Sequence, residues 1–476
     1  MTTDTPEVKP RFKFPTAFTI LFALIVVVAG LTWIVPAGQY DKVANEALGK
    51  DVAVPGSYHL VEPNPQGFKA IIMAPIAGLY DPDSYQANAI DVAVFVLMIG
   101  GFIGVVSKTG AINAGITSAM RRLKGREKWM IPVLMALFAA GGTTYGMAEE
   151  TLAFYIIVIP VMIAAGYDAL TGVAIILIGA AMGVLGSTVN AFATVIASDA
   201  AGVPFTEGIV LRLVILTVGW LVCVVYVMRY AEKVRQDPSK SLVADRKDAN
   251  EAHFLKGRDV TAAIEFTGRR KGILLIFAAT FGVMVWGVSL GGWWMAEMSG
   301  LFLASAILVG IIGRLGEEGF TTTFVDGAKD LLGVALIIGV ARGIVVVMDA
   351  GHITDTILVN AAQAVEGLST VAFINVMYWL EVALSFFVPS SSGLAVLTMP
   401  IMAPLADFSG VGRDLVVTAY QSANGLVNFF NPTFAVVMGG LAVGRVPYDR
   451  WLRFVLPLCL IITVIIMVVL SVGTML

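Results

Sequence analysis

The sequence is poor in charged residues, histidine and cysteine, and these shortages argue against several classes of protein. Of its 476 residues, 14% are charged, three are histidine and two are cysteine, whereas a soluble globular protein carries about 25% charged residues. Both cysteines, Cys223 and Cys459, lie in apolar runs, so we expect neither a structural disulfide nor a cysteine metal site. The three histidines are scattered along the chain, which does not favour a metal enzyme.

The sequence also lacks the motifs of several energy-converting and conducting proteins. It contains no Walker lysine motif, no His-x-x-x-His pattern and no Thr-Val-Gly-Tyr-Gly filter. An ATP-driven pump and a potassium channel are therefore unsupported. No nucleophile–base pair stands out, so we do not expect an enzyme. No basic patch lies outside the loops that flank apolar runs, so nucleic acid is not an expected partner.

Hydrophobic residues are abundant instead, at 58% of the chain with a mean hydropathy of +0.85. A helix needs about 20 consecutive apolar residues to cross a bilayer. Runs near this length lie at 18–35, 92–106, 170–185, 213–228, 273–288, 301–312, 332–348 and 454–472. The first run is too long for a signal peptide and lacks a clear cleavage site, so we interpret it as a retained helix. These runs predict an all-α polytopic membrane protein.

The chain contains an internal duplication. Segment 105–112 (VVSKTGAI) resembles segment 346–353 (VVMDAGHI). Three pairs of landmark residues keep almost the same separation: Gly110 and Gly351 are 241 residues apart, Pro160 and Pro400 are 240 apart, and Asn190 and Asn431 are 241 apart. We therefore predict two related transmembrane repeats, at 1–229 and 273–476, joined by a cytoplasmic linker at 230–272 with some helical character.

The distribution of basic residues predicts that the two repeats are inverted. Because Lys and Arg flank membrane spans on the cytoplasmic side, Lys9, Arg11 and Lys13 place the N-terminus in the cytoplasm, and segments 121–128 and 229–271 read as cytoplasmic for the same reason. Segment 38–66 has two lysines against four acids and is expected to be an external loop with a short hairpin. The duplicated helix therefore crosses inward in the first repeat and outward in the second. Such paired, inverted halves are typical of secondary transporters.

Polar, glycine-rich clusters interrupt the apolar sequence late in each repeat. They lie at 141–151, 186–194, 389–393 and 420–433. Irregular polar backbone at membrane depth persists only where it is buried in protein or lines a cavity. The stretches from Glu150 to Gly166 and from Pro389 to Asp407 are too short for two crossings. We therefore predict a re-entrant helical hairpin and an interrupted transmembrane helix in each repeat, with the two hairpin tips meeting near the midplane. Simple helix packing by Ser, Thr and Gly is the alternative.

Charged residues inside apolar runs are the strongest site candidates. A lone charge at the centre of a membrane helix costs roughly 2.5–3.5 kcal/mol, yet Arg342 lies within such a run. Arg342 either holds a substrate carboxylate or forms an internal ion pair with Glu381 or Asp349. Glu149 and Glu150, at the first hairpin, either bind a cation, an amine or a proton, or cap a helix.

At these residues the chain resembles a known family. Segments 141–151, 389–393 and 428–433 resemble the YfcC-like members of the ion transporter superfamily, which also contains the four-carbon dicarboxylate carriers of the DcuC type. The resemblance covers nearly the whole chain. It implies an inner-membrane carrier with two inverted repeats and a dimeric scaffold. Sodium-coupled dicarboxylate members carry Ser-Asn-Thr at both tips, where this chain has Glu-Glu-Thr and Ser-Ser-Ser. YfcC-like proteins are often labelled basic amino-acid antiporters.

We therefore predict an ion-coupled secondary transporter of a dicarboxylate or an amino acid. A basic amino-acid antiporter is the first alternative, and a passive channel or a membrane scaffold is the rival from another class. No cofactor is expected beyond Na⁺ or H⁺ as the coupling ion, and the expected partners are a small solute, lipid and a second copy of the chain. The candidate substrate-binding residues are Thr144, Glu149, Glu150, Thr151, Asn190, Arg342, Ser390, Ser391, Ser392, Asn428, Asn431 and Thr433. The candidate ion-binding residues are Ser187, Thr188, Asn190, Asn424 and Asn428.

Overall fold

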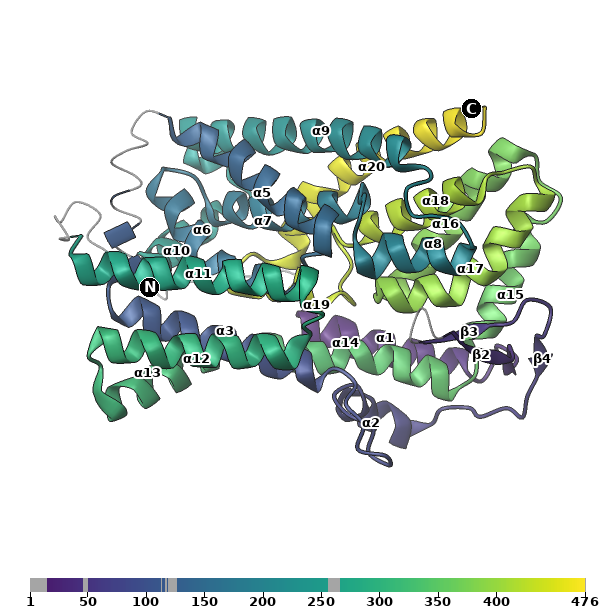
Figure 1. The fold of residues 1–476 in the computed structure, drawn as a ribbon, viewed down its shortest axis with the longest axis horizontal. Coiled ribbons are helices and arrows are strands. Elements are labelled where there is room, and N and C mark those ends of the chain that lie inside the picture. Colours follow the sequence, from purple (N-terminus) through teal and green to yellow (C-terminus); the bar gives the residue numbers. More distant parts are fainter. Residues whose placement is uncertain are drawn as a thin grey trace, which may run out of the picture.

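The computed structural model describes residues 15–45, 50–112, 114–115, 118, 126–255 and 266–475. Within these residues, eight helices are long and apolar enough to cross a membrane: α3 (Ile90–Lys108), α9 (Ile209–Gln236), α11 (Gly268–Leu290), α12 (Met295–Gly313), α14 (Leu332–Ala350), α16 (Thr370–Phe387), α17 (Ser391–Phe408) and α20 (Tyr448–Gly473). All eight predicted apolar runs fall on helices. The prediction of an all-α polytopic membrane protein is confirmed (Figure 1).

Shorter elements complete the fold. The helices are α1 (Ala17–Leu31), α2 (Phe68–Ala77), α5 (Met130–Tyr145), α6 (Leu152–Ala164), α7 (Ala169–Leu185), α8 (Ile196–Ala201), α10 (Lys247–Phe254), α13 (Gly316–Asp330), α15 (Thr354–Val365), α18 (Arg413–Val427) and α19 (Ala435–Val443). A π-helical turn, η3 (Ala191–Val195), leads into α8. The strands β1 (Gly38–Gln39) and β4 (His59–Leu60) pair antiparallel, as do β2 (Lys42–Asn45) and β3 (Lys50–Ala53). The short hairpin predicted in this loop is therefore present.

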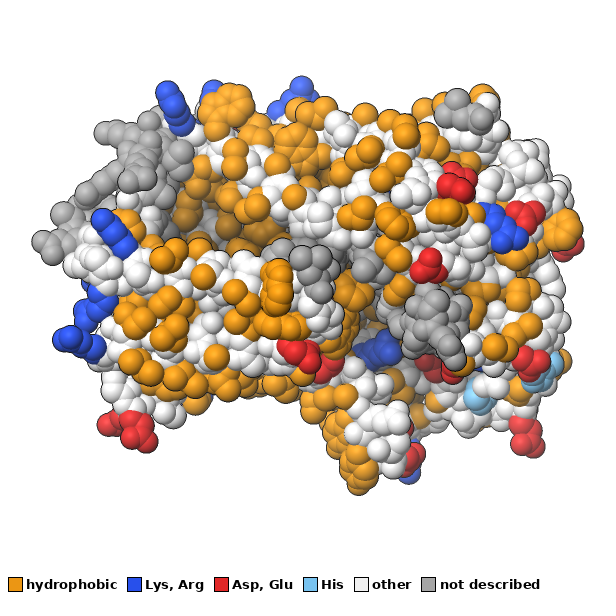
Figure 2. Space-filling model, in the orientation of Figure 1, with side chains coloured by type: hydrophobic (Ala, Val, Ile, Leu, Met, Phe, Trp, Pro, Cys, Tyr) orange, Lys and Arg blue, Asp and Glu red, His pale blue; other side chains and the backbone are white. Residues whose placement is uncertain are grey.

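The surface carries the apolar stripes of a protein that faces lipid. On α20, Leu460, Val464 and Val468 recur every fourth residue, which places them on one helix face, and they are 66%, 62% and 56% exposed. Figure 2 shows hydrophobic side chains over much of the long sides of the molecule. Water would penalise such stripes, whereas hydrocarbon does not.

Helices from both predicted repeats interleave in two packed groups (Figure 1). The α14 group consists of α1, α2, α3, α11, α12, α13 and α14. The α7 group consists of α5 to α9 and α16 to α20. Backbones approach closely inside each group: a Cβ added to Gly100 on α3 would lie 2.6 Å from the Gly327 carbonyl oxygen on α13. Packing therefore does not follow the division of the sequence into two halves.

The order of helices recurs along the chain with nearly the separation seen in the sequence. The starts of α3 and α14 are 242 residues apart, those of α7 and α18 are 244 apart, and those of α9 and α20 are 239 apart. The direction in which each helix crosses a membrane stays a prediction. Two of the basic segments that support it, residues 9–13 and 121–125, lie outside the described residues.

The linker differs in detail from the prediction. Helix α9 continues to Gln236, seven residues past the predicted boundary, because the polar sequence there contains good helix formers. Asp168, at the corner between α6 and α7, accepts hydrogen bonds from the Tyr230 and Ser241 hydroxyls, both at 2.6 Å. These two hydrogen bonds hold the start of the linker against the α7 group. Helix α13, an amphipathic helix after Arg314, was not predicted, because the polar residues in this part of the sequence are also typical of a short loop.

Candidate functional site

Two helices of the α7 group stop inside the protein. Helix α7 is buried along its whole length and ends at Leu185, and the chain resumes helical structure only at Ala191. Helix α18 is buried from Leu415 and ends at Val427, and α19 begins at Ala435. These two breaks fall in the polar clusters at 186–194 and 420–433, where the sequence predicts interrupted helices. Each break leaves backbone groups that other parts of the protein must satisfy.

The two breaks lie against each other. A Cβ added to Gly425 on α18 would lie 2.2 Å from the Leu185 Cα on α7, so the two backbones touch. The Gln421 amide donates to the Ser187 carbonyl oxygen at 2.8 Å and to that of Leu185 at 3.4 Å. Its oxygen accepts a hydrogen bond from the Thr194 hydroxyl. Gln421 therefore joins the second interrupted helix to both sides of the first break.

The tip between α5 and α6 packs on the first break. The Thr143 hydroxyl oxygen accepts a hydrogen bond from the Thr188 backbone N–H at 3.0 Å. The Asn190 amide donates to the Gly142 carbonyl oxygen at 3.5 Å, while its oxygen accepts from the backbone N–H of Phe192 at 2.8 Å. Asn190 thus caps the resumed helix and holds the hairpin arm with one side chain.

The tip between α16 and α17 packs on the second break in the same way. The Asn431 amide donates to the Phe386 carbonyl oxygen at 3.1 Å, and the Thr433 hydroxyl donates to the same oxygen at 2.7 Å. On the other arm, Ser390 caps α17 by accepting from the Gly393 N–H at 3.2 Å. Asn190 and Asn431, the pair matched in the sequence analysis, thus each donate to a carbonyl oxygen of the neighbouring tip and accept from the backbone N–H two residues later.

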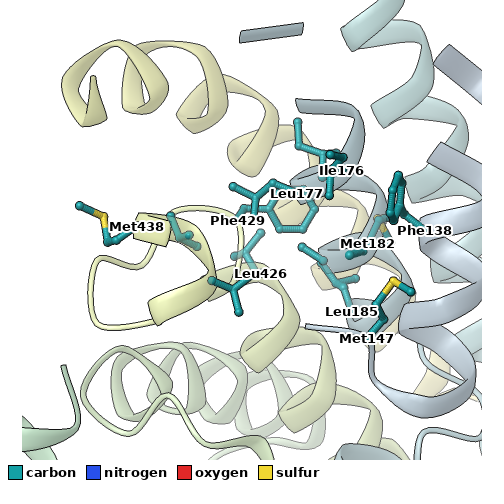
Figure 3. Close-up of a cluster of buried hydrophobic side chains, with 14 of the residues drawn as sticks. Phe138, Met147, Ile176, Leu177, Met182, Leu185, Leu426, Phe429 and Met438 are labelled. Atoms are coloured by element: carbon teal, nitrogen blue, oxygen red, sulfur yellow. The ribbon is translucent and has the colours of Figure 1, made fainter. Parts of the chain in front are cut away.

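Apolar side chains enclose this polar contact. Figure 3 shows Leu426 and Phe429, from the end of α18 and the second break, beside Leu177 and Leu185 of α7. Phe429 and Leu185 are both fully buried. Because apolar packing keeps water out, the hydrogen bonds among the breaks and tips are stronger than they would be in water.

A cavity of about 490 Å³ opens where the two helix groups meet. Arg342 and Asp349 line it from α14, Lys42 and Asp51 from the strand-bearing loop, and Ser390 from the start of α17. Among the described residues, Arg342 forms neither a hydrogen bond nor a salt bridge, although Asp349 lies close enough to feel its charge. Of the two ion-pair partners predicted for Arg342, Asp349 shares its cavity and Glu381 does not.

Several other polar groups around this cavity have hydrogen-bond partners. Asp349 accepts from the Thr354 hydroxyl at 3.0 Å, and Asp355 accepts from the Tyr40 backbone N–H at 3.1 Å. The His352 ring nitrogen Nδ1 lies 2.6 Å from the Gln39 amide. In this loop, burial together with the Asp355 carboxylate raises the pKa of Tyr40 to about 12. A guanidinium with no hydrogen bond or salt bridge to the described residues lines the same cavity as the N-terminus of α17, an arrangement that suits a carboxylate.

Most predicted site residues lie in the breaks, the tips or the cavity. Ser187, Asn190, Asn424, Asn431 and Thr433 are buried to at least 99%. Thr188, Asn428, Ser391 and Ser392 lie in the same breaks and tip. Glu150 is 6% exposed and accepts from the Ala148 N–H at 3.0 Å, next to Thr151 and the partly exposed Glu149. Thr144 is exposed and donates to the Ala140 carbonyl oxygen, so it does not join this group.

Two residues of the site were missed by sequence reasoning. Thr143, rather than its neighbour Thr144, bonds the first break, and Gln421 joins the two breaks. A signal for Gln421 exists: Gln421, Asn424 and Asn428 recur at i, i+3 and i+7, on one face of a buried helix. No such signal separates Thr143 from Thr144. In the part of the chain that the structure describes, no group of three or more His, Cys, Asp or Glu could hold a metal ion.

Two solved structures align along most of this chain, at low sequence identity and low TM-score. The YdaH transporter of Alcanivorax borkumensis is 13% identical with a TM-score of 0.41, covering 96% of this chain and 98% of that one. The MtrF protein of Neisseria gonorrhoeae is 15% identical with a TM-score of 0.42, covering 96% and 95%.

Closer relatives are found by sequence. An uncharacterized protein of Haemophilus influenzae is 38% identical over 99% of both chains. A protein of Escherichia coli, named as the putative basic amino acid antiporter YfcC, is 32% identical over 94% of both chains. The DcuC family, described as C4-dicarboxylate anaerobic carrier, matches residues 14–475. The chain therefore belongs to the DcuC family of membrane transporters.

Proposed function

We propose that the protein is an ion-coupled secondary transporter of a small solute that bears a carboxylate, with a four-carbon dicarboxylate as the first candidate. The observation that carries this proposal is Arg342, which has no hydrogen bond or salt bridge to any described residue and shares its cavity with Ser390. A guanidinium binds a carboxylate through two parallel hydrogen bonds. A charge held inside a membrane protein without a partner marks a substrate or ion pathway.

The position of the cavity also supports alternating access. Arg342 belongs to the α14 group and Ser390 to the α7 group. Movement of one group against the other would open and close the space between them. Neutral oxygens at the two breaks, at Ser187, Thr188, Asn190, Asn424 and Asn428, would hold Na⁺ if sodium is the coupling ion. We place the protein in the inner membrane as a homodimer with a cytoplasmic N-terminus.

A basic amino acid is the second candidate. Asp51, Asp349 and Asp355 line the same cavity as Arg342, so one solute could present an ammonium to the acids and a carboxylate to the guanidinium. The name of the Escherichia coli relative points to this class of solute.

Thermal unfolding of the purified protein with candidate solutes tests the proposal. A ligand at about 100 times its Kd adds roughly 2.7 kcal/mol of stability. We expect fumarate or succinate to give such a shift in the wild type and not in Arg342→Ala, with partial recovery in Arg342→Lys. Arg269→Ala, an exposed arginine on α11, is the matched control.

Other solutes and assays separate the remaining readings. A shift with lysine or arginine alone would favour the amino-acid candidate. An equal shift in the wild type and Arg342→Ala would refute the role of Arg342. Saturable counter-transport in vesicles would exclude a channel, and solute uptake of any kind would exclude a scaffold.

A further inference from the structure

Glu381 is a buried carboxyl group on α16 whose nearest side-chain donor, within the part of the chain that the structure describes, is the Thr398 hydroxyl. Glu381 lies six residues before the end of α16 and is 0% exposed. Neither of its carboxyl oxygens has a hydrogen-bond partner among the described residues. The Thr398 hydroxyl of α17 lies beside it, but that hydroxyl donates to the Leu394 carbonyl oxygen at 3.1 Å. Hydrogen-bond donors help to keep a buried carboxylate ionised, and the described residues supply none within hydrogen-bonding geometry of Glu381.

The surroundings of Glu381 continue this pattern over one more helical turn. On α16, the buried Ser385 hydroxyl oxygen has no hydrogen-bond partner among the described residues. The same holds for the side-chain amide nitrogen and oxygen of Asn424 on the facing helix α18. Tyr420, one turn before Asn424, lies close enough to sense the charge of Glu381, and its hydroxyl donates to the Ser391 carbonyl oxygen. Each of these two packed helices thus carries a polar pair four residues apart, Glu381 with Ser385 on α16 and Tyr420 with Asn424 on α18. Both pairs keep unused hydrogen-bonding capacity.

The first repeat has no counterpart of this group. An offset of 241 residues places Ala140 and Gly183 where the second repeat has Glu381 and Asn424. There α5 and α7 pack so closely that a Cβ added to Gly183 would lie 2.2 Å from the Ala139 carbonyl oxygen. Packing of these helices therefore does not require polar residues, and the polar group of the second repeat needs another explanation.

The chemistry around Glu381 suits a proton better than a sodium ion. Helices α16 and α18 are regular at Glu381 and Asn424, so their backbone carbonyls are already hydrogen-bonded within the helix. A hard metal cation needs about six oxygen ligands, which this site does not offer. The titratable groups that face this part of α16 are Tyr420 of α18, Tyr378 of α16 itself and, beside Tyr378, Cys459 of α20. None of these is a cation that would pair with a carboxylate.

We propose that Glu381 is the proton-binding residue of the transport cycle. This inference rests on the proposed function. The carboxyl group holds a proton while α16, α17 and α18 enclose it, so that the α7 group carries no unpaired charge when it moves. When the site opens to water on one side, the proton leaves the carboxyl oxygen for water. A proton taken from water on the other side restores the neutral form.

Infrared titration of the full chain in lipid vesicles tests this site with the proton itself as the probe. The signal is the C=O stretch of a protonated carboxyl group. We expect a band that disappears as the pH is raised, is missing from Glu381→Gln and is kept by Glu317→Gln, an exposed glutamate on α13. Glu381→Asp keeps a carboxyl group and should shift the band rather than remove it. If Glu381→Gln does not fold, a shifted band in Glu381→Asp assigns the band to Glu381, and an unshifted band excludes that assignment.

Uptake measured in the same vesicles tests the link to transport, with labelled fumarate and lysine as probes. We expect Glu381→Gln to lose uptake driven by a pH gradient and to keep exchange of solute for solute. An unchanged band in Glu381→Gln, or uptake equal to the wild type, would overturn the inference. If the wild type takes up neither solute, the proposed function fails and the transport role of Glu381 falls with it. The infrared band still decides the proton site by itself.

Discussion

Gly146 sets how closely the first hairpin tip approaches the first break. Its φ is 79°, in the left-handed region that L side chains rarely adopt. A Cβ added there would lie 2.8 Å from the Asn190 amide. Asn190 cannot simply move aside, because its oxygen accepts hydrogen bonds from the N–H groups of Phe192 and Ala193 at 2.8 and 3.3 Å. One small residue therefore fixes the contact between two elements of the site.

Gly146→Ala should lower both stability and transport. The left-handed backbone alone costs roughly 1–2 kcal/mol in an L residue, and displacement of Asn190 adds to this cost. Gly166→Ala is the matched control, because Gly166 has a φ of 86° and an added Cβ there meets nothing within 4 Å. Thermal unfolding and vesicle uptake of both variants provide the measurement. Equal losses in the two variants would show that contact with Asn190 does not matter.

Gln421 and Thr194 should behave as a coupled pair. Replacing Gln421 with Met keeps the volume but leaves the buried Ser187 carbonyl oxygen without its donor, which costs about 1–3 kcal/mol. Thr194→Val removes the hydrogen bond from the other end. Denaturation of the two single variants and the double variant gives the coupling energy, which we expect to be roughly 0.5–3 kcal/mol. Strict additivity of the two losses would contradict the connection drawn between the breaks.

At the scale of elements, the contact of α7 with α18 holds the two breaks in place. Gly425→Ala should destabilise the protein by about 1–3 kcal/mol or more, because the new methyl group would meet backbone atoms of Leu185 at 2.2 Å. Gly300→Ala on α12 is the control, since nothing lies within 4 Å of an added Cβ there. Alanine should stabilise that exposed helix by up to about 1 kcal/mol. A melting temperature for Gly425→Ala at or above the wild-type value would disprove the close contact.

The elements were more predictable from sequence than their contacts. Apolar runs predicted the long helices, and glycine- and asparagine-rich clusters predicted the positions of the two breaks. Both features could be predicted because each depends on residues that are close together in the sequence. The partner of Thr143 lies 45 residues away and that of Thr194 lies 227 residues away. Composition and spacing do not encode such long-range pairs. The amphipathic helix α13 was missed because its exposed acids resemble those of a loop.

The environment of Arg342 depended on tertiary structure in the same way. The sequence left two ion-pair partners open, Glu381 and Asp349. Arg342 and Asp349 lie seven residues apart on one face of α14, whereas the place of Glu381 outside their cavity depends on how α16 packs. An arginine in an apolar run can be recognised from sequence, but the absence of a nearby salt bridge cannot.

At the scale of the whole molecule, the proposed transport cycle requires the α7 group to move against the α14 group. The two groups touch where α19 meets α14: a Cβ added to Gly439 would lie 2.7 Å from the Val334 Cγ1. The two positions are therefore in direct contact, and a disulfide bond that links them would need a Cβ–Cβ separation of about 3.5–4.5 Å. A covalent link there would join the two groups.

The double variant Gly439→Cys/Val334→Cys, made after replacement of Cys223 and Cys459, should lose transport when oxidised and regain it when reduced. Solute binding should survive oxidation. The control is Thr280→Cys/Ser305→Cys, which links α11 to α12 inside the α14 group from hydroxyl oxygens 2.9 Å apart. Oxidation of this control should leave transport unchanged. Full transport by the oxidised Gly439–Val334 pair would exclude relative motion at this contact.

The packing of early helices against late ones also constrains how the protein is made. A ribosome adds roughly 5–20 residues per second, so Gln421 follows Thr194 by about 10–45 s, given their separation of 227 residues. During that interval the first break is complete in sequence but lacks its partner from α18, and α3 lacks the helices α12, α13 and α14 on which it packs. The Leu185 and Ser187 carbonyl oxygens therefore lack their donors from α18 until that helix has been synthesised, and water or the insertion machinery must satisfy them during the interval.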